Sequence, residues 1–215
     1  TTTKLKGQTT FVIGANSFGG NGKNAGVFNG KPVKVQLLKD VAAGLSGGTS
    51  FNYDTRLFID TSFTGKDLLR TMLRAGNFIG SAFEGNSNLA NANLEAGFQQ
   101  KGPNNTVNVN RLWYQFPIGS SFTATIGGIV RQDDLLAVWP SAYPTDTVLQ
   151  LFTYGGAPQT YNLQLGAGAG LWWSDNDFSI SVNYVSGNGN NSSPFVKDSG
   201  NGFLRLKVPL FKSQS

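Results

Sequence analysis

Arginine side chains recur at spacings that place them together on one face of an extended segment. Arg70 and Arg74 are four residues apart, and Arg56 has the same parity as Asp54 and Asp60. In a β-strand, residues two or four apart point to the same side of the sheet. The intervening positions in these segments are mostly apolar. The pattern therefore predicts strands with one charged face and one apolar face.

Five arginines form the candidate charged wall, because the positions of opposite parity beside them are mainly apolar: Arg56, Arg70, Arg74, Arg111 and Arg131. If the apolar faces meet lipid, the arginines line a water-filled lumen, since charge facing lipid costs about 2–4 kcal/mol at the bilayer midplane. We hypothesise that this pore-lining wall attracts anions and orders water. The alternative is the exposed face of a soluble sheet.

A long connection with poor alternation follows the last of these arginines. Residues 132–159 contain Asp133, Asp134, Trp139 and Tyr143. Long loops inside compact domains are usually functional or disordered, and this one is rich in aromatic residues. We hypothesise that it folds inward as a constriction loop and pairs its acids with wall arginines, so that facing rows of opposite charge create a transverse field. The alternative is a surface loop with solvated acids.

Enzymatic and metal chemistry have little support. The chain has no cysteine and no histidine, which excludes thiol chemistry and removes the commonest general base and metal ligand. Residues 19–23 lack the spacing of a phosphate-binding loop, and a hairpin turn is expected there. The net charge is +5, but the basic residues are scattered rather than clustered along a track for nucleic acid. We therefore expect no catalysis, no cofactor, no metal site and no nucleic-acid partner.

The composition and the dominant period of two favour a β-rich chain. Charged residues make up 13% of the 215 residues, about half the usual share. Phe178, Ile180, Val182 and Tyr184 alternate with serine and asparagine, and residues 161–173 alternate over a length that can cross a hydrocarbon layer at a barrel tilt. No apolar run of about 18 residues exists, so no transmembrane helix is expected.

The alternation predicts roughly ten strands, at 5–13, 31–38, 51–60, 68–78, 93–99, 107–116, 122–131, 161–173, 178–184 and 203–210. Gly65-Lys66 and Gly119-Ser120 suit tight hairpins between them. We expect one all-β domain over residues 1–215: an antiparallel up-and-down transmembrane β-barrel, or a roughly ten-stranded part of one. Aromatic residues near the strand ends suit a membrane-interface girdle or the core of a soluble sandwich.

Several motifs give the chain a specific resemblance to a known family. The longest is RLFIDTSFTGKDLLR at residues 56–70, continued by LRAGNF at 73–78. Further motifs lie at 112–119 (LWYQFPIG), 131–134 (RQDD), 137–144 (AVWPSAYP), 166–173 and 178–184. Over about residues 1–189 the chain resembles the cyanobacterial major outer-membrane porins, which are carbohydrate-selective-porin-like proteins also known as iron-uptake porins.

This resemblance implies a barrel in the cell outer membrane, in contact with its lipid. Small hydrophilic solutes, including carbohydrates and inorganic ions, would cross it by passive diffusion. Porins often pack their barrel walls into trimers, so a homo-oligomer is expected. Family members begin with a cell-wall-binding module and a helical linker. By this comparison the chain would start after both and would lack the C-terminal part of the barrel.

Two other classes of function remain open on the residues alone. One is a β-rich structural subunit of a filament or surface layer, derived from a porin barrel. The other is a carbohydrate-binding sandwich that uses Trp139, Tyr143 and Trp172. A barrel should need detergent to stay folded in solution, whereas neither alternative should.

Overall fold

The computed structural model describes residues 1–19, 24–28, 31–34, 40, 42, 44–84, 94–97, 102–138, 164–175, 178–190 and 205–207. The strands and 3-10 turns are β1 (Thr2–Gly14), β2 (Asn24–Phe28), β3 (Lys31–Lys34), β4 (Ser50–Ser62), β5 (Leu68–Gly76), η1 (Glu95–Gly97), β6 (Asn108–Ile118), β7 (Phe122–Arg131), η2 (Gln132–Leu135), β8 (Leu165–Asp175), β9 (Phe178–Ser186) and β10 (Arg205–Lys207). In these ranges no helix has the length and apolar character needed to cross a membrane.

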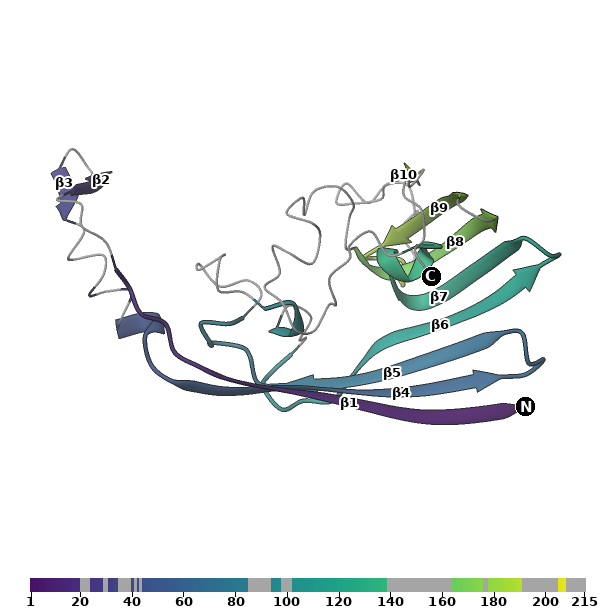
Figure 1. Ribbon diagram of the computed structural model, residues 1–215, viewed down its shortest axis with the longest axis horizontal. Coiled ribbons are helices and arrows are strands. Elements are labelled where there is room, and N and C mark those ends of the chain that lie inside the picture. Colours follow the sequence, from purple (N-terminus) through teal and green to yellow (C-terminus); the bar gives the residue numbers. More distant parts are fainter. Residues whose placement is uncertain are drawn as a thin grey trace.

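One antiparallel sheet contains eight of the strands, in the order β1-β4-β5-β6-β7-β8-β9-β10. Between β1 and β4, the strands β2 and β3 pair with each other as a separate hairpin that projects away from the sheet (Figure 1). The sheet curls, so that β8 and β9 lie opposite β1, β4 and β5 (Figure 1). The predicted all-β, antiparallel up-and-down architecture is therefore confirmed.

The two ends of the sheet have connections of very different length. At one end, short turns join β4 to β5, β6 to β7 and β8 to β9. At the other end, long segments join β1 to β4, β5 to β6 and β7 to β8. The predicted tight hairpins are present at the short end, where Gly65 and Gly119 have φ angles of +85° and +65°. Glycine adopts this left-handed conformation without the steric penalty that a Cβ atom would bring.

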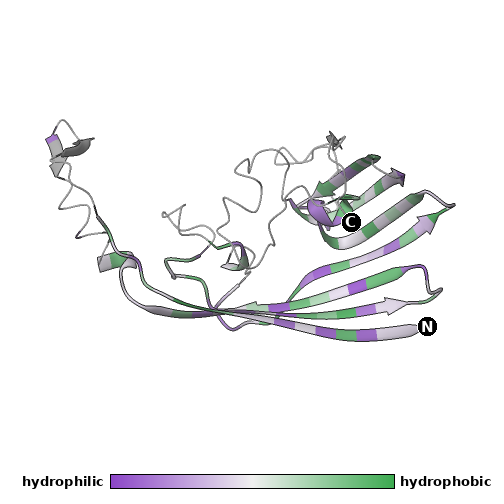
Figure 2. Ribbon diagram, viewed as in Figure 1, coloured by the Kyte–Doolittle hydropathy of each residue, from purple (hydrophilic) through white to green (hydrophobic). Residues whose placement is uncertain are grey.

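The two faces of the sheet differ in polarity, and hydrophilic and hydrophobic residues alternate along its longer strands (Figure 2). The outer face, which we call the apolar face, carries exposed large side chains: Leu5, Phe11, Ile13, Phe51, Leu112, Ile118, Phe122, Ile126, Leu171, Phe178 and Ile180. The inner face, which we call the polar face, carries buried polar side chains: Asn52, Asp54, Arg74, Arg111, Thr125, Ser181 and Asn183. Most of the large exposed hydrophobic side chains of the described strands thus point away from the curl.

A small hydrophobic core lies where η2 packs on the polar face. It consists of Trp113, Val130, Leu135 and Val185, with Leu68 against it. Gly170 of β8 makes room for Leu135, because a Cβ atom on Gly170 would lie 2.9 Å from the Leu135 Cβ. The turn after β7 is therefore seated on the sheet by packing as well as by charge.

One predicted strand is wrong, and one observed strand was not predicted. The strand expected at 93–99 is wrong, because Glu95–Gly97 form a 3-10 turn in which the Gly97 N–H donates to the Leu94 carbonyl at 3.0 Å. Local backbone hydrogen bonds replace a strand ladder there. The strand β2 was not expected, since its short sequence follows a glycine-rich run.

Candidate functional site

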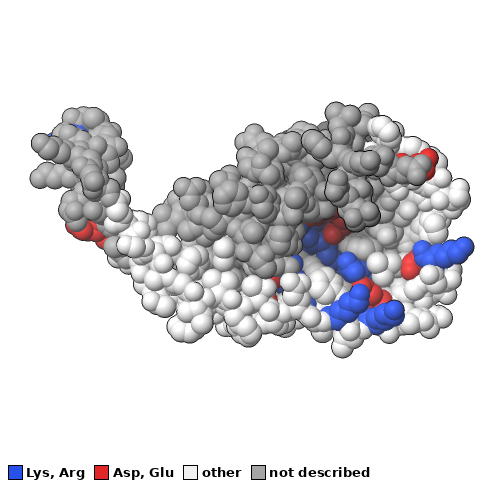
Figure 3. Space-filling view, viewed as in Figure 1, with Lys and Arg blue, Asp and Glu red and all other residues white. Residues whose placement is uncertain are grey.

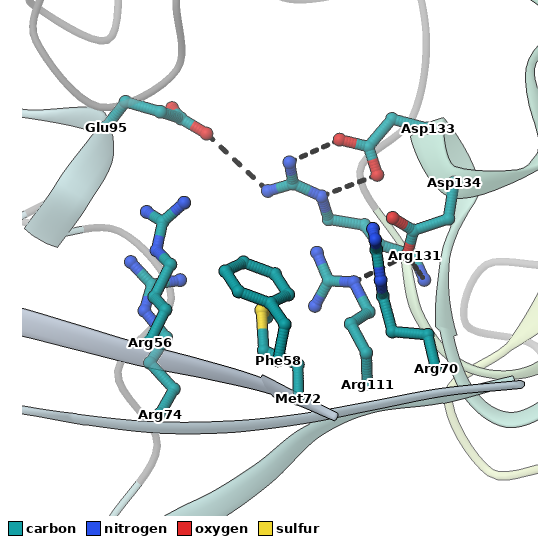
Figure 4. A pocket seen from close by; sticks show the side chains of 10 residues that line it. All are labelled: Arg56, Phe58, Arg70, Met72, Arg74, Glu95, Arg111, Arg131, Asp133 and Asp134. Carbon is teal, nitrogen blue, oxygen red and sulfur yellow. Dashed lines mark hydrogen bonds and ion pairs between the residues drawn. The ribbon is translucent and has the colours of Figure 1, made fainter. Parts of the chain in front are cut away.

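The five predicted arginines lie around one pocket on the polar face. It has a volume of about 210 Å³ and is lined by Arg56, Phe58, Arg70, Met72, Arg74, Glu95, Arg111, Arg131, Asp133 and Asp134. Charged side chains gather in the hollow of the molecule in Figure 3. In the close-up, Arg56 and Arg74 lie on one side of Phe58 and Met72, and Arg70 and Arg111 lie on the other (Figure 4).

Strand register positions these side chains. Arg56 of β4 pairs with Arg74 of β5, and Arg70 of β5 lies between Asp60 of β4 and Trp113 of β6. All of them have the parity that points to the polar face, as the sequence predicted. A register shift in the pairing of β5 with β6 lets the consecutive residues Asn110 and Arg111 both be buried. Such a bulge re-aims side chains that strict alternation would place on opposite faces.

One carboxylate bridges the first pair of arginines. Asp54 accepts from Arg56 Nε at 2.7 Å and from Arg74 Nε at 2.5 Å. Like charges directly opposite each other on neighbouring strands destabilise a sheet, and the shared carboxylate offsets that repulsion. Arg74 Nη2 also donates to the carbonyl of Ala96 at 2.7 Å, which fastens η1 to the sheet.

Arg70 is held by a second carboxylate and by two aromatic rings. Its Nε and Nη2 each donate to Asp60 at 2.8 Å, in the two-pronged geometry that guanidinium and carboxylate groups favour. Its Cζ lies 5.2 Å from the centroid of the Phe58 ring and 5.3 Å from that of the Trp113 ring. With 30% of its side chain accessible, Arg70 is the most exposed of the wall arginines for which an ion pair is described.

The remaining arginines fasten the segment that follows β7. Arg111 Nε donates to Asp134 at 2.5 Å, and Arg131 Nε donates to Asp133 at 2.7 Å. The Arg131 backbone N–H donates to the Asp134 carboxylate at 2.9 Å, and Glu95 of η1 lies 3.5 Å from Arg131 Nη1. Both acids of the predicted constriction loop are thus paired with predicted wall arginines.

The structure describes residues 132–138 of this loop, and these begin on the polar face with η2. Trp139 and Tyr143 lie outside the described residues. Trp172 of β8 pairs in register with Ser181, which is buried on the polar face.

Arginines and carboxylates are balanced in this site. The five arginines meet five carboxylates, from Asp54, Asp60, Glu95, Asp133 and Asp134. The site is therefore not a bare positive wall, because Asp54 and Asp60 lie among the arginines on β4 and three further carboxylates face them from η1 and η2. Facing rows of opposite charge produce a strong local field across the space between them. Within the part of the chain that the structure describes, no group of three or more metal-ligating side chains could hold a metal ion.

Sequence reasoning did not select three acidic residues of the site. Asp54 and Asp60 share the parity of Arg56, and this signal is visible in the sequence. Glu95 carries no such signal, because it reaches Arg131 from a segment far away in the chain. Phe58 and Met72, which lie between the arginines, were also not selected, since apolar residues on a charged face break the alternation.

Comparison with known proteins finds two cyanobacterial relatives. "Uncharacterized protein sll0772" of Synechocystis sp. is 31% identical over 158 residues, which cover 73% of this chain and 27% of that protein. "Uncharacterized protein alr4550" of Nostoc sp. is 30% identical over 213 residues, which cover 90% of this chain and 32% of that protein. The chain therefore spans about a third or less of the length of these curated relatives. No protein-family model matches the chain. No solved structure matches it either.

Proposed function

We propose that this chain forms part of the wall of a transmembrane β-barrel in a bacterial-type outer membrane, through which small hydrophilic solutes and inorganic ions diffuse passively. One observation carries the proposal, namely the separation of an exposed apolar face from a charged inner face. Phe11, Phe51 and Phe178 are at least 60% exposed on the apolar face, while the arginines are sequestered on the opposite one. Contiguous apolar surface of this kind suits contact with lipid better than contact with water.

The asymmetry of the connections supports the same proposal. Outer-membrane barrels have short turns at the periplasmic end and longer loops outside. In this chain all the turns that join β4 to β5, β6 to β7 and β8 to β9 are short, and they share one end of the sheet. Near that end the rings of Tyr114 and Phe116 stack at 5.4 Å, and Phe63 meets Tyr114 edge-on at 6.2 Å. Aromatic groups of this kind favour a membrane interface.

A barrel needs both edges of its sheet to be paired, because unpaired backbone groups are costly in lipid. Among the described residues the sheet has one edge at β1 and the other at β10. We propose that further strands complete the barrel, which accords with relatives that are much longer than the matched region. We also propose that complete barrels associate as homo-oligomers, with the trimer as the expected form.

Within this proposal the charged pocket is the selective part of the pore. The arginines form the lumen wall, and the segment that begins at η2 narrows the lumen from inside. The pairs Arg111–Asp134 and Arg131–Asp133 support this arrangement, because they hold the segment against the wall. A transverse field between the two rows of charge would filter solutes by size and dipole.

The competing proposal is a structural subunit of a filament or surface layer. It is favoured by the open edges at β1 and β10, which are suited to strand pairing between copies. The apolar face argues against it, since such a subunit would expose that face to water.

Reconstitution tests the two proposals against each other. The protein, extracted in detergent and added to a planar lipid bilayer, should produce discrete conductance steps in KCl, and its mobility on a gel should change on heating. A protein that stays monodisperse without detergent and produces no conductance would contradict the pore proposal. It would favour the proposal of a structural subunit.

A further inference from the structure

We infer that the pocket on the polar face binds a small inorganic oxyanion and that Arg70 is the residue that holds it. The inference rests on the proposed function, since it names the solute class for which this part of the pore would be selective. It is carried by three features of the pocket: the donor geometry of Arg70, the apolar floor beside it, and the distribution of charge among the lining residues.

Arg70 offers a hydrogen-bond donor toward a ligand. Its Nε and Nη2 are taken by Asp60, but among the described residues its Nη1 has no hydrogen-bond partner. Its side chain is also 30% exposed, compared with 6% for Arg111 and 4% for Arg74. A guanidinium group with a free outer edge binds oxyanions through short, charge-assisted hydrogen bonds.

The surroundings hold the Arg70 guanidinium in a defined place. Phe58 and Trp113 lie within 5.3 Å of its Cζ, and such contacts with ring faces are attractive. Asp60 accepts from Nε and Nη2 of Arg70 and so competes with an anion for the same guanidinium. Because the group is already ordered, little side-chain entropy is lost when an anion binds. Phe58 and Met72 form an apolar floor beside it.

The charges that line the pocket favour an anion on the side of the strands. Five arginines line it but only three carboxylates do, and these three come from η1 and η2. Each of the three contacts an arginine: Glu95 and Asp133 contact Arg131, and Asp134 contacts Arg111. Asp54 and Asp60 lie outside the lining. The pocket volume of about 210 Å³ leaves room for an ion of the size of phosphate with part of its hydration shell.

Titration with inorganic phosphate tests the inference on the full-length protein in detergent. Trp113 lies beside Arg70, so its fluorescence should change in a saturable way as phosphate is added, relative to KCl at equal ionic strength. R70Q should weaken the apparent affinity about tenfold or more, because a hydrogen bond between charged groups is lost. K66Q removes the same charge in an exposed turn outside the pocket and should leave the affinity unchanged.

D60N provides the decisive contrast. It removes the carboxylate that competes for Arg70, so it should strengthen phosphate binding, whereas a purely structural role for the Arg70–Asp60 pair predicts that both variants weaken it. If R70Q fails to fold, the phosphate affinity of D60N still tests the inference. The inference is overturned if phosphate acts no differently from chloride, if R70Q binds phosphate like the natural protein, or if D60N binds it more weakly.

Conductance in KCl on the same preparations separates this inference from the proposed function. Channels that open normally but bind no phosphate would contradict the oxyanion site and would not affect the pore proposal. Phosphate binding that depends on Arg70, in a protein that forms no channels, would support the oxyanion site and contradict the pore proposal.

Discussion

Asp134 in η2 accepts a 2.5 Å hydrogen bond from Nε of Arg111 in β6, so the residues that follow β7 are tied back to the strand that precedes it. The contact spans the polar face and lies beside the Arg131–Asp133 pair. Together the two ion pairs turn the segment after β7 inward at its first residues. Its inward course therefore depends on side-chain charge in addition to the packing of Leu135.

Breaking the Arg111–Asp134 pair should destabilise the sheet. D134N leaves the largely buried Arg111 guanidinium beside a neutral amide, and removing one partner of a buried pair is costly. We expect a loss of about 2–3 kcal/mol in the free energy of unfolding, measured by urea titration in detergent. D175N changes the same group at the exposed end of β8 and should cost about 0.5 kcal/mol or less. Equal effects of the two variants would show that the pair contributes nothing.

Removing both acids of η2 should change ion selectivity. D133N/D134N removes two of the three lining carboxylates, leaving Glu95, and keeps all five arginines in place. The reversal potential of single channels in a KCl gradient should then shift toward anion selectivity. Single-channel currents and reversal potentials identical to those of the natural protein would remove the constriction role from this segment.

A methyl group at Gly170 should lift η2 from the sheet. The added Cβ would lie 2.9 Å from the Leu135 Cβ and 3.1 Å from that of Asn183, closer than such atoms normally approach. G170A should therefore cost about 1–3 kcal/mol through overpacking, measured by urea unfolding. G128A is the matched control, because a Cβ at Gly128 meets nothing within 4 Å. If G170A unfolds at the same urea concentration as G128A, Leu135 is not seated on Gly170.

A charge on the apolar face should impair membrane insertion. Ile126 is 58% exposed on this face, and a lysine at the bilayer midplane costs about 2–4 kcal/mol. I126K should lower the yield of heat-modifiable, folded protein in lipid vesicles. Thr123 lies on the same strand but has the parity of Thr125, which is buried on the polar face. T123K should therefore fold with nearly normal yield, and an equal loss for both variants would contradict lipid contact at Ile126.

Acid should weaken the β4–β5 turn through Asp67. Burial raises the pKa of this carboxyl, but hydrogen bonds from Thr64, Tyr114 and Ser62 outweigh burial and hold its pKa well below the usual value. The Thr64 N–H and the Tyr114 hydroxyl each donate to it at 2.7 Å. Because the pKa is lower in the folded state, the ionised group stabilises the turn at neutral pH, and that contribution declines as pH falls below the unfolded value of about 3.9.

The pH dependence of D67N checks this expectation. The amide cannot ionise, so the urea midpoint of D67N should fall less between pH 5 and pH 3 than that of the natural protein. The variant should also be less stable at pH 7, because the charge-assisted hydrogen bonds are weakened. Parallel curves for the two proteins would exclude Asp67 as a source of acid sensitivity.

The alternating pattern by itself determined which face most strand residues take, outside the register shifts. Arg70 and Arg74 share the polar face because side-chain direction in a strand depends only on parity, which is a local property of the backbone. The hairpins at Gly65 and Gly119 were predictable for a similar reason, since a tight turn requires a conformation that glycine favours locally. The strand content and the separation of polar from apolar residues therefore followed from short stretches of sequence.

The tertiary structure alone decided which charges meet. Glu95 reaches Arg131 only because η1 lies against the sheet, and no local pattern specifies that contact. The burial of Asn110 beside Arg111 depends on a register shift against β5, which parity alone would not predict. The balance of five arginines with five carboxylates is likewise a sum over distant segments, because ion pairing depends on distances in space and not on spacing along the chain.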